Sequence, residues 1–590
     1  MIKSVFLSFC MAAGFSLAQT YDLPIVFIDT KGQCLDNTKN EKMPATMSVL
    51  DGESNSVADS AKGTHYNIGI KVRGQSSAKF PKPGYSVEVR DEKGEGMDVS
   101  MFGLPPADDW VFHGPYVDKS MMRNALAHWL FRQAGHYSPR TKHFDLYING
   151  VYRGVYVLIE KIKRGKYRVN VSKLKETDIS GDDVTGGYIW AFDKTGTNTG
   201  GMGMENISKE GFNTSDGLNV IMHYPKKANL KKEQEEYLKK YLNDLEAIFK
   251  NGGSKKGYDK YVDMVSAYDY VLHEEVTNNS DSYWCSFFLH KPKDSKGGKV
   301  TLGPAWDFNL AMSNGGGMGS TTTTGWQIEN SQKSGNGGMM MGGGLKAPIW
   351  LTGMWKDADY QSELKKRWAE LRSGVWHTKT MDAYLDSMKT YLTKAADRNF
   401  KRWPNLGQGS GQGDPDPEPM KYCNQNQGGQ NQGGMWGGMW GGGGGGFSMG
   451  GNNASTWDGE FEHLRKKMKE RMQWMDQQLN FKEPANPIVT EPVIHLPDWQ
   501  NDTIPGTTEP PTIDIRMDDM SRLSPTNFFV VNGNNLEIHT DLGGSLAIID
   551  LNGAVLYKTR IKTGITNLTV PAKARDKHWI ATLNGKMLSK

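Results

Sequence analysis

Two short segments decide the expected organisation of this chain: Asn278-Asn279-Ser280-Asp281-Ser282-Tyr283 and Gly303-Pro304-Ala305-Trp306-Asp307-Phe308-Asn309. Between them, two apolar runs flank a turn rich in lysine, glycine and aspartate: Phe287-Phe288-Leu289-His290 and Lys299-Val300-Thr301-Leu302. This pattern predicts a β-hairpin. Because a hairpin reverses the chain, it would bring Asp281 and Asp307 to the same end of a sheet.

Two aspartates at one end of a sheet are typical of phosphoryl transfer. One carboxylate accepts or orients the attacking hydroxyl, and a second, ahead of a phenylalanine, holds the magnesium that bridges the nucleotide phosphates. The alternative is that both aspartates are turn or cap residues, which is the commoner role of aspartate at a strand end. The two aspartates alone leave both interpretations open.

The N-terminus has the pattern of a secretory signal. Lys3 precedes an apolar core that runs from Val5 to Leu17, and the small residue Ala18 stands ahead of the expected cleavage site. Residues 1–18 are therefore expected to be removed. No later apolar run is long enough to span a bilayer. We expect a protein without a transmembrane segment that is secreted or at the cell surface.

Composition excludes two further classes of protein. Once the signal is removed, the cysteines are Cys34, Cys285 and Cys423, so an odd number remains and disulfides are not the framework of the fold. The net charge of +4 comes from 70 basic and 66 acidic residues in mixed order. Nucleic acid is therefore not an expected partner.

Hydrophobic periodicity predicts an α+β chain. Alternation of apolar and polar residues predicts strands at 23–29, 68–73, 85–90, 143–147 and 151–159. Asn149-Gly150 joins the last two strands and is a strong hairpin signal. Helical spacing predicts helices at 118–133, 232–249, 264–276, 360–371, 381–400 and 461–479.

Low-complexity segments divide the chain. Glycine-rich insertions at 313–344 and 407–453 contain too few packing residues for regular structure. A Pro/Thr-rich linker is expected at 481–526. After it, short strands punctuated by Asn-Gly and Gly-Gly turns predict a small all-β sandwich at 527–590.

Several short motifs, taken in their order along the chain, resemble the CotH family of secreted proteins. The resemblance covers residues 23–480 apart from the glycine-rich insertions. Its carriers are Arg73-Gly74-Gln75-Ser76-Ser77, Pro81-Lys82 with Tyr85, Met122-Arg123-Asn124-Ala125-Leu126, Tyr152-Arg153-Gly154-Val155-Tyr156 through Glu160, Asn279 with Asp281, Trp306-Asp307-Phe308, Arg398-Asn399-Phe400 and Arg471-Met472-Gln473-Trp474. The resemblance implies an atypical protein-kinase-like, two-lobed domain that uses ATP with Mg²⁺ or Mn²⁺.

The resemblance also implies a nucleotide site. A turn whose backbone N–H groups and hydroxyls approach the phosphates would consist of Arg73, Gly74, Ser76 and Ser77. Lys82 occupies the place of the phosphate-pairing lysine by order, with Lys79 and Lys161 as alternatives, and Lys82 as an exposed turn lysine is an equally open interpretation. Glu160 ends the strand that would lead to the hinge, where the backbone meets adenine.

The same comparison assigns roles to the hairpin residues. Asp281 takes the position of the catalytic base and Asp307 that of the metal ligand. Kinases carry asparagine at the fifth position after the base, and this chain has Ser286 there. A hydroxyl is a poorer Mg²⁺ ligand than an amide oxygen, so the second metal would be held more weakly.

The leading interpretation is a secreted kinase that transfers phosphate from ATP to Ser or Thr of exported proteins. One alternative is a non-catalytic cell-surface or adhesion protein that uses the kinase-like fold as a binding module. A carbohydrate-active protein ranks last, because the 17 tryptophans and the carboxylates cannot be placed in one groove. The tail is similar to C-terminal sorting domains of exported proteins in Bacteroidetes-like and Fibrobacter-like bacteria, on the residues Ile549-Asp550-Leu551-Asn552-Gly553, which suggests attachment at the outer surface.

Overall fold

The structure is a computed structural model, and it describes a main unit and the strands of a C-terminal tail. In the main unit the described residues are 20–33, 35, 41–52, 54–74, 77–193, 210–250, 257–314, 322–331, 346–407 and 454–488. The expected signal, Ser76, most of both glycine-rich insertions and the linker beyond 488 lie outside the described residues.

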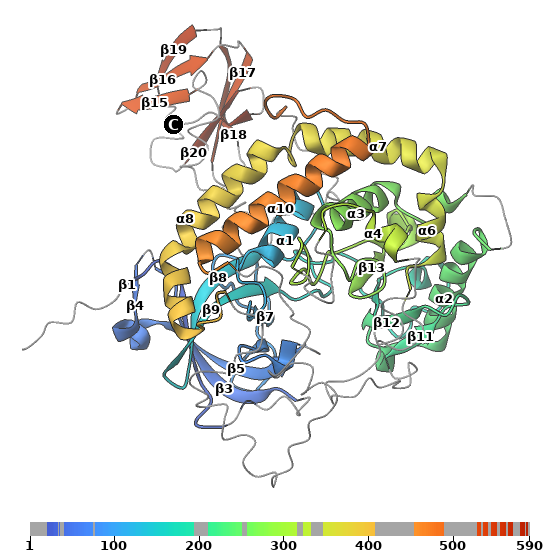
Figure 1. Cartoon of the computed structure of the whole chain (residues 1–590), viewed down its shortest axis with the longest axis horizontal. Helices are drawn as coiled ribbons and strands as arrows, with labels where there is room; N and C mark the ends of the chain where they lie inside the picture. Colours follow the sequence, from blue (N-terminus) through green and yellow to red (C-terminus); the bar gives the residue numbers. More distant parts are fainter. Residues whose placement is uncertain are drawn as a thin grey trace, which may run out of the picture. The chain divides into compact units, whose positions relative to one another are not determined.

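A closed β-barrel forms the first part of the main unit (Figure 1), with the strand order β2-β3-β5-β6-β7-β9-β8. Its strands are β2 (Ile25–Asp29), β3 (Met43–Leu50), β5 (Thr64–Arg73), β6 (Gly84–Arg90), β7 (Asp109–His113), β8 (Thr141–Ile148) and β9 (Val151–Glu160). Consecutive neighbours pair antiparallel, but β2 and β8 pair in parallel, with Ile25 opposite Asp145. This parallel pair closes the barrel.

The prediction of a two-lobed kinase-like domain is wrong. The strands expected in the first lobe close into a barrel, because β2 finds a partner in β8 more than a hundred residues further along the chain. Alternate residues of β6 (Tyr85, Val87 and Val89) are fully buried, as period-two alternation requires of strands with one face turned inward. The wider prediction of a mixed α+β chain is confirmed.

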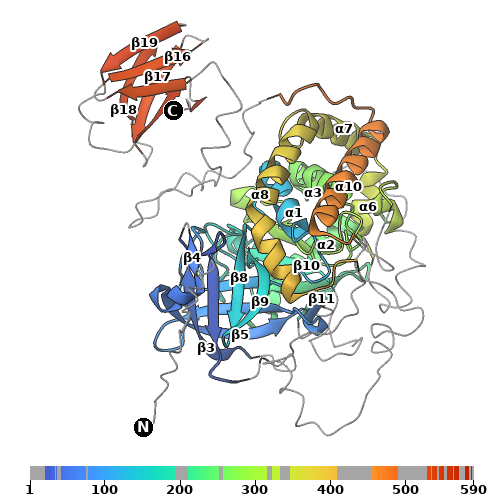
Figure 2. The same cartoon turned by 60° about the vertical axis from the view of Figure 1, so that its left-hand side comes forward.

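The rest of the main unit contains a second sheet and the helices (Figures 1 and 2). The sheet has the order β11-β12-β10-β13-β14, and its strands are β10 (Tyr188–Phe192), β11 (Gly211–Asn213), β12 (Asn219–Tyr224), β13 (Phe287–Lys291) and β14 (Thr301–Leu302). The α-helices are α1 (Arg123–Gln133), α2 (Lys232–Ala247), α3 (Met264–Thr277), α4 (Gln327–Asn330), α6 (Ile349–Trp355), α7 (Ala358–Ser373), α8 (Thr378–Arg402) and α10 (Trp457–Gln478).

Short elements complete the main unit. A two-stranded ribbon pairs β1 (Thr20–Tyr21) with β4 (Asn55–Ser56). The described 3₁₀ turns are η1 (Val57–Lys62), η2 (Ser77–Lys79), η3 (Gly181–Val184), η5 (Lys227–Asn229), η6 (Tyr258–Lys260) and η7 (Asp294–Lys296).

Two helices differ from the sequence-based expectation. Helix α1 begins at Arg123 and not at Asp118. The Asp118 Oδ2 atom, which precedes the helix, accepts the Arg123 N–H at 2.8 Å, and this N–H has no partner within the first turn. Helix α4 lies inside the insertion that was expected to lack regular structure. The buried Glu275 carboxylate accepts the N–H groups of Gln327 at 2.7 Å and Ile328 at 2.9 Å, which fixes the start of α4.

Helices α8 and α10 run side by side, and α8 also packs on β9 (Figures 1 and 2). Arg398 on α8 forms a buried ion pair with Asp145 of β8 at 2.7 Å. The next residue, Asn399, accepts the backbone N–H of Val155 at 3.1 Å. These contacts tie the barrel to the helical part, and they involve residues of the motifs on which the resemblance rests.

The tail, expected to be a small sandwich, has its described strands in two antiparallel sheets. One sheet has the order β15-β16-β19 and the other β18-β17-β20-β21. The strands are β15 (Phe528–Asn532), β16 (Asn535–Thr540), β17 (Gly544–Asp550), β18 (Val555–Ile561), β19 (Gly564–Thr569), β20 (Trp579–Leu583) and β21 (Lys586–Met587). Across the described part of the whole chain, no helix combines the length and the apolar character needed to cross a bilayer.

Candidate active site

The predicted hairpin is confirmed and places the two aspartate loops at one end of a sheet. Strands β13 and β14 pair antiparallel, with Leu289 opposite Leu302. The pairing continues where Gly303 N–H donates to the Phe288 carbonyl at 2.9 Å. The loop before β13 carries Asp281 and the loop after β14 carries Asp307. Both aspartates are half-buried.

Backbone strain is concentrated in these two loops. Non-glycine residues rarely adopt a positive φ angle, because the Cβ atom then crowds the backbone. Six such residues lie in the two loops and at their borders: Asn278 (50°), Tyr283 (70°), Ser286 (53°), Asp307 (67°), Met312 (55°) and Ser313 (59°). Strained residues persist only where their surroundings hold them, and they are typical of functional sites.

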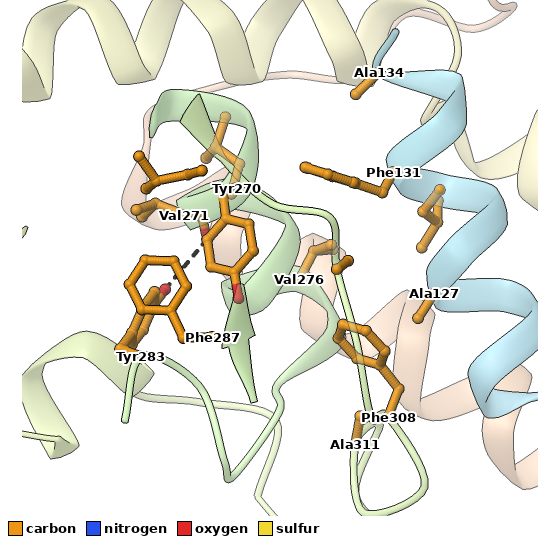
Figure 3. Packing of buried hydrophobic residues seen from close by; sticks show 14 of the residues in the cluster. Ala127, Phe131, Ala134, Tyr270, Val271, Val276, Tyr283, Phe287, Phe308 and Ala311 are labelled. Atoms are coloured by element: carbon orange, nitrogen blue, oxygen red, sulfur yellow. Dashed lines mark hydrogen bonds between the residues drawn. The ribbon is translucent and has the colours of Figure 1, made fainter. Parts of the chain in front are cut away.

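The Asp307 loop is held by α1 and α3. Asn124 Oδ1 accepts the N–H of Phe308 at 3.0 Å, and Arg123 Nε donates to the Ala311 carbonyl at 3.1 Å. Met312 N–H donates to the last carbonyl of α3, that of Thr277, at 2.7 Å. Figure 3 shows Phe308 and Ala311 in the buried cluster beside residues of both helices. The metal-position aspartate is thus fixed by the residues that follow it.

The Asp281 loop is held by the last turns of α3. Glu274 Oε2 accepts hydrogen bonds from Asn279 Nδ2 at 3.1 Å and from Ser282 Oγ at 2.8 Å. The buried Tyr283 hydroxyl lies 3.3 Å from the Val271 carbonyl, the contact that Figure 3 marks with a dashed line. Asp281 therefore stands between two anchored neighbours.

Arg73 and Asp307, two of the predicted site residues, are brought together. The Arg73 guanidinium lies 5.5 Å from the ring centroid of Trp306. Burial lowers the pKa of Arg73, and the Asp307 carboxylate opposes this shift by attraction. Since Arg73 ends β5, the pair joins the barrel to the aspartate loop.

The outer face of the barrel next to this pair carries a buried apolar cluster. Val111 of β7 and Val157 and Ile159 of β9 form one buried cluster, against which Trp306 packs. Alternation along the strands puts the side chains of Arg73 and these three residues on the outer face of the barrel. The side chains of the barrel core lie on the inner face. Trp306 and Asp307 therefore face the outer surface of β5, β7 and β9.

Cations gather on the same face. Lys71 precedes Arg73 on the same side of β5, and its pKa is lowered by burial and by repulsion from Lys42, Lys161 and Arg73. Asp109 accepts from Lys42 at 2.5 Å and from Lys161 at 3.0 Å, and the pKa of its carboxyl is lowered by these lysines against the effect of burial. An anion bound here would relieve the repulsion among the cations.

A group of three carboxylates borders the cations. Within the described ranges, one set of residues could share a cation by proximity: Glu88, Asp108 and Asp109. Each of them is already paired with a basic side chain: Arg90, Lys163 and Lys42 respectively. These pairs account for the cluster as an ion-pair network.

Lys82 and Glu160 point elsewhere. Lys82 is buried, donates to Asn399 Oδ1 at 2.7 Å and has its pKa lowered by burial. Glu160 is fully buried on the inner face of β9, where its carboxylate pairs with Arg140 at 3.0 Å and with Arg168 at 3.2 Å. The structure therefore does not bring these two side chains to the face that carries Arg73.

Gly74 directly follows β5, Ser77 begins η2, and Ser286 directly precedes β13. Gly74 has a φ of +105°, and the Ser77 side chain fills the space next to its Cα, so a larger residue would not fit. Ser76 lies outside the described residues. Ser286 Oγ is 3.9 Å from the sulfur of Cys285, whose thiol donates to Asp193 Oδ1 at 3.1 Å.

Sequence reasoning missed several residues near the site. Asp193 directly follows the buried strand β10, and a carboxylate after a buried strand was the available signal. Lys71 lies two positions from Arg73 on a strand whose alternation was recognised. Asn124 stands in one of the motifs that carry the resemblance, but nothing in the sequence gave its contact with the Asp307 loop. Glu274 carried no signal, because it lies within a helical pattern and acts on a loop that packs there only in the folded chain.

One comparison with known proteins identifies a family for this chain. A family model described as CotH kinase protein matches residues 70–475, which is more than half of the chain. This range includes the end of β5 with Lys71 and Arg73, both aspartate loops and nearly all of α10. No curated protein matches the chain.

Proposed function

The chain belongs to the CotH kinase protein family, and from this premise we propose that it transfers the γ-phosphoryl group of ATP to Ser or Thr hydroxyls of exported proteins. The observation that carries the proposal is the approach of Arg73 on the barrel to the Asp307 loop. The Arg73 cation, with the Trp306 ring and the Asp307 carboxylate next to it, suits the phosphates and metal of a bound nucleotide.

The outer face of the barrel offers what a nucleotide needs. Arg73, Lys71 and Lys161 would neutralise phosphate charge, since charge-assisted contacts to phosphate are the strong ones. Val111, Val157 and Ile159 are buried under Trp306 next to these cations, and the half-buried Trp306 ring is the apolar group against which a purine ring could pack. We assign phosphate pairing to Arg73 and Lys161 in preference to Lys82, because Lys82 is buried against Asn399.

The aspartates divide the remaining work. The Asp307 carboxylate has the oxygen chemistry that a hard cation prefers, so it would hold Mg²⁺ or Mn²⁺, which neutralises charge on the transferring phosphoryl group. Asp281 would accept a hydrogen bond from the acceptor hydroxyl and orient it for attack. Ser286, at the border of the same loop, would contribute a weaker ligand than the asparagine of other kinases.

Location and partners are part of the proposal. The signal-like residues 1–18 support export, and an exported protein is therefore the acceptor we propose. The resemblance of the tail to sorting domains supports attachment at the outer surface. The competing proposal of a non-catalytic binding module is favoured by Ser286 in place of the asparagine ligand, and it predicts nucleotide or partner binding without transfer.

The test uses the purified chain from Gln19 to Lys590, labelled ATP, Mg²⁺ or Mn²⁺, and a serine-rich acceptor such as casein. We expect label on serine or threonine, and nucleotide-dependent thermal stabilisation. Asp307→Ala is the matched control, and it should abolish both signals while leaving the melting temperature of the apo chain unchanged. Stabilisation by nucleotide without any transfer would favour the binding module. The absence of both signals would refute the kinase proposal.

A further inference from the structure

A buried carboxyl group lies directly behind the Asp281 loop. Glu274, in the last turn of α3, is only 1% exposed. A single oxygen of this group, Oε2, accepts from Asn279 Nδ2 at 3.1 Å and from Ser282 Oγ at 2.8 Å. The two donors stand on either side of Asp281 in the chain. One carboxylate therefore accepts hydrogen bonds from both ends of the turn that contains Asp281.

The turn depends on such support. Tyr283 and Ser286, which follow it, have φ angles of 70° and 53°. Asp281 N–H itself donates to Asn279 Oδ1 at 3.3 Å, so the side chain that Glu274 holds in turn holds the backbone of Asp281. A turn in an unfavourable backbone conformation relaxes when its outside contacts are removed.

The surroundings of Glu274 set its protonation. The groups that face it are the Tyr270 hydroxyl, His273, Glu275, Asn279 and Ser282. Of these, His273 has an Nδ1 atom 4.0 Å from Glu274 Oε1, but burial lowers the pKa of that imidazole to about 4, so it is neutral at pH 7. Within the described ranges, no lysine or arginine forms an ion pair with Glu274; the nearby Arg471 pairs with Glu275 instead.

Burial therefore dominates. It raises the pKa of Glu274 to about 7, against the hydrogen bonds from Ser282, Asn279 and Tyr270, while the neighbouring charge of Glu275 raises it further. The group therefore changes its charge near pH 7.

We propose that Glu274 is a positioning residue for phosphoryl transfer, whose ionised carboxylate orders the turn that carries Asp281. The proposal rests on the kinase function proposed above. The ionised group accepts from Asn279 and Ser282 together. The protonated group is a weaker acceptor. It also carries a hydroxyl that needs an acceptor, whereas Asn279 and Ser282 face it with donors.

The direction of the pH effect follows from this. Below pH 7 Glu274 is mostly neutral and the turn is loosened, and above pH 7 it is ionised and the turn is ordered. Turnover should rise with pH through a midpoint near 7. The KM for ATP should stay flat across the same range, because Glu274 contacts no residue of the barrel face.

The test compares full-length wild type with Glu274→Gln across pH 5.5 to 9. The variant keeps the shape of the side chain but carries no charge and does not titrate. At pH 8 we expect kcat to fall about tenfold, less than the hundredfold or more expected for loss of the base itself, with KM for ATP unchanged within about twofold. The step near pH 7 should disappear. An unchanged kcat with the step still present would overturn the proposal.

A second pair of variants covers the case in which Glu274→Gln does not fold. Ser282→Ala removes one donor, so the midpoint should move to higher pH, since a hydrogen bond that stabilised the carboxylate is lost. Ser282→Thr retains a hydroxyl and should restore the wild-type midpoint. If Ser282→Ala leaves the midpoint and kcat as in wild type, the proposal fails.

Hydrogen exchange separates this proposal from the kinase proposal. The measurement is made without nucleotide and at the same pH for both chains. Backbone amides of residues 279–286 should exchange at least tenfold faster in Glu274→Gln than in wild type, whereas the exchange rates of the α8 amides should be the same in both. Faster exchange in a chain that never labels an acceptor would overturn the kinase function but not the hold of Glu274 on the turn. Transfer activity with unchanged exchange and an unchanged pH profile would overturn the positioning role alone.

Discussion

Replacing Arg471 by methionine tests the contact that joins α10 to the end of α3. The guanidinium is 1% exposed and makes several contacts with α3 and the segment before α4. Nη2 pairs with Glu275 Oε2 at 3.0 Å and Nε donates to the Glu275 carbonyl at 2.6 Å. Nη1 donates to the Gly325 carbonyl at 2.7 Å. Methionine is similar in length but supplies no donor and no charge.

The expected loss is large because the partner stays behind. Glu275 is fully buried and would keep hydrogen bonds from the Tyr283 hydroxyl and from the N–H groups of Gln327 and Ile328. Breaking a buried ion pair by removing one partner costs about 3–5 kcal/mol, because the remaining charge is uncompensated. We expect the free energy of unfolding to fall by about 3–5 kcal/mol at pH 8, the range measured for such pairs.

The pH dependence gives an independent check. Burial already raises the pKa of Glu275, and attraction to Arg471 opposes the shift. Removal of Arg471 would raise that pKa further, so Glu275 in the folded chain would bind a proton at a higher pH. A carboxyl group whose pKa is higher in the folded than in the unfolded chain destabilises the folded state at pH values above the folded-state pKa. It has no such effect at pH values below the unfolded-state pKa. The deficit of Arg471→Met should therefore be smaller near pH 5 than at pH 8.

The assay is urea unfolding of the full chain, followed by tryptophan fluorescence, with the midpoint and slope compared between variants. Lys466→Met on the same helix is the matched control, because the Lys466 side chain is 73% exposed and pairs with Glu470 one turn along α10. It should leave the midpoint unchanged. A cycle with Glu275→Gln should recover part of the loss. A deficit below about 1 kcal/mol, the scale of a surface pair, would refute the role given to Arg471.

Three further changes separate the catalytic, nucleotide and scaffold residues. Asp281→Asn should lower kcat by about a hundredfold or more, the scale of a general base, with nucleotide binding preserved by thermal shift; equal loss of binding and turnover would indicate a structural carboxylate. Lys161→Met should raise the KM for ATP by roughly tenfold, as expected for a lost charge contact worth about 1.4 kcal/mol, and an unchanged KM would remove it from the phosphate site. Lys82→Met should leave the KM for ATP unchanged while altering the melting temperature, because Lys82 contacts Asn399 in the interior; a large KM effect would restore Lys82 to the nucleotide site.

Local sequence determined the elements whose signals lie within a few residues of one another. Helical spacing placed helices that the structure shows as α2 (Lys232–Ala247), α3 (Met264–Thr277) and α8 (Thr378–Arg402), within a few residues at each end. Asn149-Gly150 placed the β8–β9 hairpin, since both residues adopt the positive φ angles that its turn requires. The hairpin between Asp281 and Asp307 was likewise readable, because turn chemistry and alternation suffice to predict it.

Tertiary structure alone decided how these elements combine. The parallel pairing of β2 with β8 closes the barrel, and no short-range signal specifies it, because its hydrogen bonds join strands from distant parts of the chain. The same holds for the site. Alternation put Arg73 on one face of its strand, but only the packed loop puts Asp307 next to it. Lys82 looks like a turn lysine in the sequence, and only the approach of α8 buries it against Asn399, since burial depends on what the rest of the chain brings to a residue.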